Sequence, residues 1–272
     1  MPDLPRYFDG LLQAFDQGQV GRFVHLGTWQ SPPSTETLGN AGAFDAAQAR
    51  LNEQLLELAT LQDGQHVVDV GCGFGGTLQA IDARWQGMRL TGINIDPRQL
   101  EVCNGLRATG ANTLHWLQAD ACRLPLPDHS VDRVLCIEAM FHFDSRRAFF
   151  EQAARVLRRG GVLVVSDILP WAAAHERSSP RLVEAALSVL DGFGPWPDFW
   201  SLDADHQALA SRAGLMCTAH IDATRQTLPS HLFTAPANAP TGDNPVAKAA
   251  WALAMLHRGG WLRYPLLRFE RL

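Results

Sequence analysis

The stretch at residues 67–76, Val-Val-Asp-Val-Gly-Cys-Gly-Phe-Gly-Gly, constrains the fold of this chain more than any other. A run of β-branched residues that ends in closely spaced glycines predicts a buried strand, a tight turn and then a helix. In α/β sheets this turn is where a nucleotide binds, because glycines let backbone N–H groups approach the ligand. Gly71, Gly73 and Gly76 fit the G-x-G-x-x-G spacing of dinucleotide-binding proteins. A tight turn that binds no ligand favours the same glycines. Other motifs must therefore show whether this turn binds a nucleotide.

The segments after this turn alternate between strand and helix patterns, which is typical of a parallel, doubly wound sheet. The predicted strands after the first are 89–95, 113–118, 131–137, 162–167, 215–221 and 261–269. The predicted helices among them are 78–85, 97–109, 146–157, 181–190, 203–213 and 245–256. We therefore expect an α/β fold built on a Rossmann-like sheet that is mostly parallel and seven-stranded.

The composition suits an ordinary globular chain, with 46% hydrophobic and 19% charged residues. A net charge of −5 argues against binding nucleic acid or an anionic membrane through bulk charge. The five cysteines are odd in number and lack C-x-x-C spacing, which favours a reducing compartment over a disulfide framework. The N-terminus lacks the basic region of a secretory signal, and no apolar run reaches membrane-spanning length. We expect a cytoplasmic protein without nucleic-acid or membrane partners.

The glycine stretch has a second interpretation as Asp-x-Gly-x-Gly-x-Gly, which starts at Asp69 inside the predicted strand. This pattern resembles the cofactor loop of class I S-adenosylmethionine-dependent methyltransferases. In that family the acidic residue helps to order the loop, and the glycines lie against the methionine part of the cofactor. The resemblance implies S-adenosyl-L-methionine as the cofactor, bound here by Asp69, Gly71, Cys72 and Gly73.

The end of the second predicted strand separates the two interpretations. A dinucleotide enzyme carries Asp or Glu about 20 residues beyond the glycines, whereas this chain has Asn94 there and Asp96 two residues later. The Gly-x-Asn-x-x-x-x-Gln pattern at 92–99 instead resembles the branch that includes tocopherol and sterol C-methyltransferases, cyclopropane fatty acid synthases and the rebeccamycin sugar O-methyltransferase. By this resemblance Asn94, Ile95 and Gln99 surround the adenosine ribose. The alternative is that Asn94 only begins a turn.

Three more segments match the same branch in the same order. Gln-Ala-Asp-Ala ends at Ala121, and the resemblance implies that Asp120 accepts the adenine amino group while the backbone of Ala121 faces the ring. The segments 124–134 and 154–162 resemble the family's links into its fourth and fifth strands. The resemblance therefore covers roughly residues 60 to 170.

A further match lies ahead of this core. His-Leu-Gly-Thr-Trp, from His25 to Trp29, resembles a stretch of the branch that helps to close over the cofactor. The resemblance implies cofactor contacts for both residues. A tryptophan is just as often a packed core residue, and a purely structural role stays open for both Trp29 and His25.

Methyl transfer from a sulfonium needs alignment, exclusion of water and a group that takes the proton of the nucleophile. The segment 137–143, Ile-Glu-Ala-Met-Phe-His-Phe, follows the fourth predicted strand and resembles the Glu-x-x-His-His of the sugar O-methyltransferase. Glu138 matches its acidic residue, His142 matches the second histidine, and Phe141 replaces the first. We expect His142 to be the general base, supported by Glu138, because an imidazole titrates near neutrality. A histidine packed at a strand end is the alternative.

A metal site is a further alternative for this segment. Glu138 and His142 are four residues apart and share one face of a helix, with Asp144 close behind. The sequence has no further cluster of His or Asp near them, so we expect no metal.

Two regions outside the core are expected to cover the site. The apolar spacing in 4–20 predicts a lid helix. We assign residues 1–60 to an N-terminal helical cap and 61–272 to the core, with a cap insertion at about 171–200. The resemblance also implies that the last two strands form an antiparallel pair at the C-terminal sheet edge.

The residues expected to contact substrate are aromatic: Phe141, Trp196, Phe199 and Trp200. The loop that carries the last three fits a rigid cover over the core almost as well.

The resemblances imply in-line transfer of a methyl group from S-adenosyl-L-methionine to a small, apolar metabolite of natural-product type. O-methylation with His142 as the base is the first expectation. C-methylation of an isoprenoid or alkene, with Glu138 stabilising a cation, is the alternative within the class. An NAD-dependent oxidoreductase and a binding protein without turnover are the alternatives outside it. The sequence leaves the assembly open, with a homodimer as one option.

Overall fold

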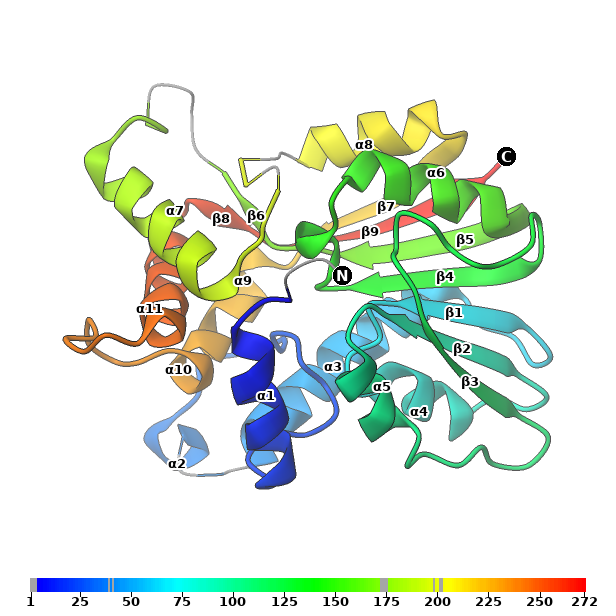
Figure 1. Ribbon diagram of the computed structural model, residues 1–272, viewed down its shortest axis with the longest axis horizontal. Coiled ribbons are helices and arrows are strands. Elements are labelled where there is room, and N and C mark those ends of the chain that lie inside the picture. The colour runs from blue at the N-terminus through cyan, green and yellow to red at the C-terminus, as the bar shows by residue number, and fades with distance from the viewer. Residues whose placement is uncertain (1–3, 39, 41, 172–175, 198, 201–202) are drawn as a thin grey trace.

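The computed structural model describes residues 4–38, 40, 42–171, 176–197, 199–200 and 203–272. A seven-stranded sheet forms its centre, in the order β3-β2-β1-β4-β5-β9-β7 (Figure 1). The strands are β1 (His66–Val70), β2 (Arg89–Asn94), β3 (Thr113–Gln118), β4 (Val131–Ile137), β5 (Leu157–Ser166), β7 (Leu215–Asp222) and β9 (Pro265–Arg271). Strands β1 to β5 are parallel, and β9 is antiparallel to both of its neighbours. The predicted fold is confirmed, including the antiparallel pair at the edge.

Helices cover both faces of the sheet. On one side lie α3 (Gly42–Ala59), α4 (Gly76–Asp82) and α5 (Pro97–Cys103), and on the other α6 (Arg146–Val156) and α8 (Asp203–Arg212) (Figure 1). Successive side chains of a strand point to opposite faces, and each face has its own apolar core. Val67 belongs to the core that contains α3 and α4, whereas Val68 belongs to the core that contains α6. The β-branched run at the start of the glycine stretch thus fills two core layers.

A third group of helices lies beyond the carboxyl ends of the parallel strands (Figure 1). Its long members are α1 (Tyr7–Asp16), α7 (Pro180–Phe193) and α11 (Pro245–Arg258), and α7 packs against α11. Its short members are α2 (Thr35–Leu38), η1 (Met140–His142), α9 (Thr224–Thr227), η2 (Leu228–Ser230) and α10 (His231–Thr234), with the strand pair β6 (Leu169–Pro170) and β8 (Leu262–Arg263). Part of the expected cap insertion at 171–200, namely residues 172–175 and 198, lies outside the described residues.

Three elements differ most from the prediction. Helix α5 ends at Cys103 rather than near residue 109, because Gly105 soon follows and glycine is a poor helix former. Strand β5 begins at Leu157, before its two glycines, and the pairing with β4 shifts register there while Gly160 has a φ of 73°. The last predicted strand is divided at Tyr264, whose backbone N–H donates to Thr224 Oγ1 instead of extending β8.

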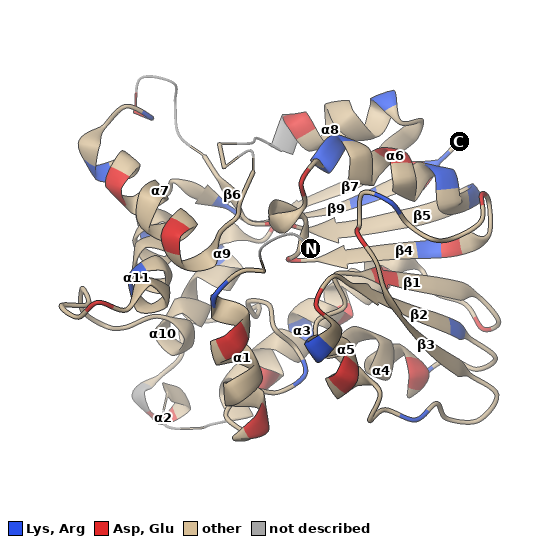
Figure 2. Ribbon diagram, viewed as in Figure 1, with Lys and Arg blue, Asp and Glu red and all other residues tan. Residues whose placement is uncertain are grey.

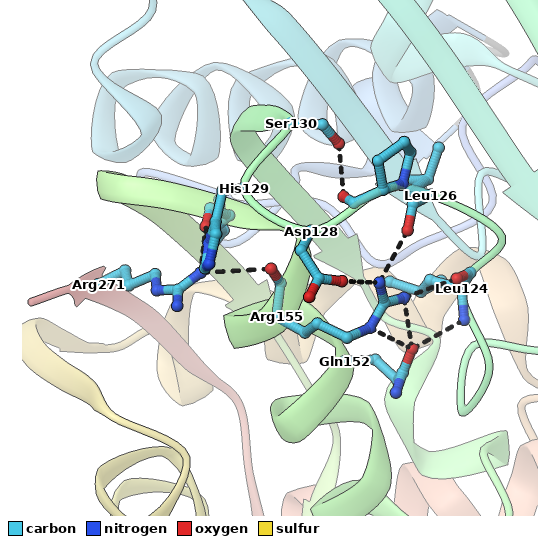
Figure 3. Close-up of polar contacts among 10 residues, drawn as sticks. Leu124, Leu126, Asp128, His129, Ser130, Gln152, Arg155 and Arg271 are labelled. Carbon is cyan, nitrogen blue, oxygen red and sulfur yellow. Dashed lines mark hydrogen bonds and ion pairs between the residues drawn. The ribbon is translucent and has the colours of Figure 1, made fainter.

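Two of the sequence motifs meet in a polar cluster at the amino ends of β4 and β5 (Figure 3). The guanidinium of Arg155 donates to the backbone oxygens of Leu124 (2.7 Å) and Leu126 (2.8 Å) and forms an ion pair with Asp128 at 2.6 Å. Arg271, near the C-terminus, donates to Nδ1 of His129 at 2.5 Å and also to the backbone oxygen of Leu157. These contacts hold the connection from β3 to β4 against α6 and β9, so the two motifs have a structural role.

Charged residues of both signs are interspersed over the described elements rather than gathered on one side (Figure 2). None of the helices in the described part of the chain combines the length and the apolar character that crossing a bilayer demands.

Candidate active site

A cavity of about 270 Å³ lies where the carboxyl ends of β1 to β4 meet helix α1. Most of its wall comes from the sequence motifs and the rest from α1 and two loops. The lining residues are Leu4, Pro5, Tyr7, Phe8, Leu11, Val24, Val70, Gly71, Gly73, Ile93, Asn94, Ile95, Gln99, Ala119, Asp120, Ala121, Ile137, Glu138, Ala139, His142, Phe143, Asp144 and Pro195. The cavity sits where open α/β sheets bind their ligands.

The glycine turn forms one wall of this cavity. Gly71 has a φ of 80°, which side chains rarely adopt, and a Cβ there would lie 2.4 Å from the Cβ of Ala139. A Cβ on Gly73 would lie 2.7 Å from a methyl group of Val24. Any larger residue at either position would move the segments that enclose the cavity, so both glycines are required for its shape.

The predicted ribose-binding residues lie together at the end of β2. The side-chain amide of Asn94 donates to Gln99 Oε1 at 3.0 Å, and Asn94 Oδ1 accepts the backbone N–H of Asp96 at 3.1 Å. The buried Nε2 of Gln99 has no partner among the described residues, so it offers two N–H donors at the cavity wall. Asp96 instead caps α5 through the N–H of Arg98 and pairs with its guanidinium at 2.8 Å. This structural role explains why the acidic residue is displaced.

The predicted adenine-binding residues lie on the same cavity after β3. Asp120 Oδ1 accepts the backbone N–H of Cys122 at 2.7 Å, which fixes the carboxylate, and Ala121 beside it is buried. The carboxylate keeps acceptor capacity for a ligand, since an ionised carboxylate has about four lone-pair sites.

Asp69, Cys72 and His25 line a smaller neighbouring cavity of about 20 Å³. His25 Nδ1 donates to the backbone oxygen of Leu26 at 2.7 Å, and its buried Nε2 has no partner in the described chain. Burial lowers the pKa of His25 to about 4, so the ring is neutral and Nε2 is an open acceptor. Burial raises the pKa of Asp69 to about 7. The two side chains thus place an open acceptor and a carboxyl group beside the glycine turn.

Trp29 lines neither cavity. Its indole N–H donates to Ser230 Oγ at 3.1 Å, and its ring stacks on Phe233 with the centroids 5.2 Å apart. Ser230 also accepts the backbone N–H of Gly27 at 2.9 Å. Trp29 therefore anchors the 25–29 segment to α10, while a contact between Trp29 and the cofactor stays a prediction.

Glu138 joins three parts of the chain directly after β4. It has a φ of 49°, and its Oε2 accepts the backbone N–H of Leu26 at 2.8 Å and the hydroxyl of Tyr264 at 2.5 Å. Burial raises its pKa to about 7. The sequence did not indicate Tyr264, because 126 residues separate it from Glu138 and it stands in no motif.

His142, in η1, is held at both ring nitrogens. The carbonyl of Pro195 can only accept, so Nδ1 donates to it, at 3.0 Å. Nε2 must then be the acceptor, and the hydroxyl of Tyr7 donates to it at 2.8 Å. Burial lowers the pKa of His142 to about 4, which keeps the imidazole neutral. The near-neutral titration expected from the sequence is therefore wrong, because an imidazolium loses hydration at this position. The spacing of apolar residues predicted α1 as a lid, but nothing in it indicated that Tyr7 would contact His142.

The predicted substrate aromatics form a packed row behind the cavity instead of lining it. Phe141 contacts Trp196 with centroids 4.4 Å apart, Trp196 contacts Phe199 at 5.3 Å, and Phe199 contacts Trp200 at 5.0 Å. The first three are buried in the core. Their contact with substrate stays a prediction, and the aromatic rings that do line the cavity are Tyr7, Phe8 and Phe143.

The alternative of a metal site needs a cluster of side chains that can bind a metal ion. Among the described residues, no group of three or more His, Cys, Asp or Glu side chains is arranged to hold a metal ion. Glu138 and His142 do share the cavity wall, yet each is bonded to other partners.

Comparisons with known proteins point to one family. Residues 68–165 match the model of a methyltransferase domain. The chain is 35% identical to methyltransferase GfsG of Streptomyces halstedii over 81% of this chain and 74% of that protein. It is 31% identical to 27-O-demethylrifamycin SV methyltransferase of Amycolatopsis mediterranei over 84% of this chain and 79% of that protein. The solved structure of a geranyl diphosphate methyltransferase shares the fold, with a TM-score of 0.73 at 19% identity over 96% of this chain and 94% of that one.

The residues present fit S-adenosylmethionine. The open donors of Gln99, the carboxylate of Asp120 and the side-chain-free surface of the glycine turn offer polar partners and room along one cavity. The buried Asp69 carboxyl beside that turn suits a cationic ligand group. An NAD-dependent oxidoreductase is disfavoured both by Asn94 at the end of β2 and by the comparisons. The chain belongs to the class I S-adenosylmethionine-dependent methyltransferases, and its cofactor is S-adenosyl-L-methionine.

Proposed function

We propose that this methyltransferase acts on a hydroxyl oxygen of a small, uncharged and largely apolar metabolite, with His142 as the general base. The observation that carries this proposal is the larger cavity described above. Its wall includes Asn94, Gln99 and Asp120, which suit an adenosine, together with a neutral histidine and the half-buried carboxyl group of Glu138. One relative of similar length is named for O-methylation, which supports oxygen as the acceptor atom.

Bound S-adenosylmethionine supplies an electrophilic methyl group, so the protein has to orient an acceptor and manage one proton. Helix α1 closes the cavity with Phe8 and Leu11, which exclude water from the reacting groups. Nδ1 of His142 is held by Pro195, which fixes the tautomer and leaves Nε2 as the acceptor of that proton.

The charges of the wall restrict the substrate. None of the described residues that line the cavity is Lys or Arg, whereas Asp120, Glu138 and Asp144 all line it. A diphosphate needs cationic partners, because a buried phosphate without them is strongly disfavoured. Arg177 lies over the ring of Trp200, 5.9 Å from its centroid, and does not line the cavity. We therefore propose a substrate without phosphate groups, in contrast to geranyl diphosphate.

A second candidate function is C-methylation of an alkene. The observation that favours it is the half-buried carboxyl group of Glu138 on the cavity wall, which would stabilise a developing carbocation better than a neutral imidazole. In that case Glu138 would contact the reacting carbon chain and His142 would matter less. O-methylation therefore predicts that turnover is more sensitive to substitution of His142, whereas C-methylation predicts that it is more sensitive to substitution of Glu138.

The deciding experiment is to incubate the protein with methyl-labelled S-adenosylmethionine and three acceptor sets: apolar alcohols and phenols, apolar alkenes, and prenyl diphosphates. We expect label in an alcohol or phenol, as an ether. Label on a carbon of an alkene would support the second candidate, and label on a prenyl diphosphate would contradict the substrate class. Product position is read by NMR.

His142→Ala gives the sharpest test of the base. We expect turnover on the hydroxyl acceptor to fall about 10²- to 10⁴-fold, because that is what a positioned general base contributes. The dissociation constant of S-adenosylhomocysteine, measured by calorimetry, should stay within about threefold of the wild-type value, since a base makes no large contribution to ground-state binding. Unchanged turnover would remove His142 as the base.

A further inference from the structure

Tyr7 is the only residue of α1 whose polar group meets the candidate base. Its hydroxyl lies 2.8 Å from His142 Nε2, and the two rings stack with centroids 5.7 Å apart and planes at 28°. Phe8 and Phe193 pack edge-on against Tyr7 at 4.8 and 5.2 Å, which fixes the direction of the phenol. Both Tyr7 and His142 line the cavity.

This contact takes the one lone pair that His142 offers. Nδ1 donates to Pro195, so only Nε2 can accept a proton, and the Tyr7 hydroxyl already donates to it. A substrate hydroxyl therefore has no direct access to Nε2 while α1 is in this position. Tyr7, however, is a residue of the cavity wall, and its oxygen has lone pairs of its own that can accept a substrate hydroxyl.

Resting on the function proposed above, we propose that Tyr7 is a catalytic residue that relays the proton of the substrate hydroxyl to His142. The substrate O–H donates to Tyr7 Oη, and Tyr7 O–H donates to His142 Nε2. As the substrate oxygen forms its bond to the methyl carbon, the carbon–sulfur bond breaks and its electron pair stays on sulfur. The substrate proton passes to Tyr7 Oη while the Tyr7 proton passes to Nε2, which leaves a neutral ether, a neutral thioether, a neutral tyrosine and an imidazolium.

The surroundings of Tyr7 suit a relay rather than a separate ionisation. Burial and the nearby Glu138 carboxyl raise the pKa of Tyr7, so the phenol stays protonated and acts as a donor to His142. A phenolate would be an unfavourable stable intermediate here, which favours simultaneous transfer of both protons. Because Tyr7 belongs to the lid, the proton path is complete only when α1 covers the cavity. Chemistry would thereby be coupled to exclusion of water.

Helix α1 has a second tether that is independent of Tyr7. Asp9, on its exposed side, pairs with Arg98 at 2.6 Å and lines neither cavity. Asp9→Asn weakens the lid without touching His142, so it is the matched control for loss of lid closure. Tyr7→Phe keeps the ring and its packing and removes only the hydroxyl.

The experiment compares Tyr7→Phe, Asp9→Asn, His142→Ala and the double variant Tyr7→Phe/His142→Ala in single-turnover methyl transfer to the hydroxyl acceptor. We expect Tyr7→Phe to slow transfer at least about 100-fold with little change in KM or in S-adenosylhomocysteine affinity. Asp9→Asn should instead raise KM with a smaller effect on the rate. The double variant should be no slower than His142→Ala, because residues that act as one unit are not additive.

A proton inventory in mixed H₂O and D₂O gives a readout that lid packing would not change. For the wild-type protein we expect the transfer rate to depend on the deuterium fraction of the solvent along a curve, since two protons move. For the residual rate of Tyr7→Phe we expect a straight line. An unchanged or faster rate in Tyr7→Phe, with His142→Ala still slow, would overturn the relay and leave the proposed function standing. If His142→Ala keeps full activity, the proposed base itself is wrong.

Discussion

Asp69 is a carboxyl group in the middle of a parallel strand, with only 2% of its surface exposed. A charge in that position loses its hydration, and burial therefore raises its pKa from 3.8 to about 7. Protein stability is reduced by such a group when it ionises. The residue is nevertheless suited to pair with the cationic end of the methyl donor, which we propose as its role. Binding and stability thus make opposite demands on Asp69.

The pH dependence of stability tests this account of Asp69. Between pH 4 and 7 the folded protein binds one proton more than the unfolded chain at this site, so its contribution to stability falls as pH rises. The slope is at most about 1.4 kcal/mol per pH unit. Asp69→Asn removes this group, and the free energy of unfolding should fall less steeply over that range. Urea unfolding at several pH values measures this free energy for both proteins. Parallel pH dependences in the wild-type protein and Asp69→Asn would contradict the raised pKa of Asp69.

Residues whose role is set by local spacing could be predicted from the sequence. Asn94 and Gln99 are five positions apart at a strand end, and the turn and helix between them bring the side chains together. Tyr7 could not be predicted, since its partner lies 135 positions away and is selected by packing of the lid. Trp196 shows a different limit, because composition alone does not distinguish a pocket wall from a buried core.

Among elements, the start of α6 is tied to the end of β5 and to the loop after α7 by one buried arginine. Arg146 is 2% exposed, lies 3.4 Å from Asp167 Oδ2 and donates to the backbone oxygen of Pro197 at 2.9 Å. Asp167 also accepts from His206 of α8 at 2.9 Å. The same loop supplies the Pro195 carbonyl that orients His142. Arg146 therefore connects the architecture to the candidate site.

Arg146→Ala and Arg147→Ala form a matched pair on the same turn of α6. Loss of Arg146 leaves a buried carboxylate without its cation, which costs about 3–5 kcal/mol. Arg147 is 68% exposed and pairs with Glu151 along the helix, so its loss should cost less than about 0.5 kcal/mol. Urea unfolding of both variants checks the difference. Similar destabilisation in the two would refute the bridging role of Arg146.

Elements of five or more residues could be predicted, because a periodic pattern needs at least two repeats to show. The four-residue helices α2, α9 and α10 and the strand pair of β6 and β8 have no such pattern. Their conformation depends on the core beneath them. These short elements connect the cap to the sheet, so the cap was the least predictable part of the fold.

At the scale of the whole molecule, the first 60 residues divide into two parts with different roles. Helix α1 has no buried residue, and it supplies Tyr7, Phe8 and Leu11 to the cavity wall. Helix α3 buries Leu51, Leu55 and Leu56 in the core on one face of the sheet. We propose that the separable lid ends before α3 and that α3 belongs to the core.

Two truncated chains test this division. A chain starting at residue 21 lacks α1 and should keep its cooperative unfolding and its affinity for S-adenosylhomocysteine within about tenfold, because little core surface is lost. It should lose methyl transfer, since Tyr7 and the lid are gone.

A chain starting at residue 61 lacks three leucines that are at most 2% exposed. Each contributes about 1.5–3 kcal/mol, and their sum approaches the whole stability of a typical domain. That chain should fail to unfold cooperatively in calorimetry. A stable, cooperative chain from residue 61 would instead support a cap that comprises all of residues 1–60.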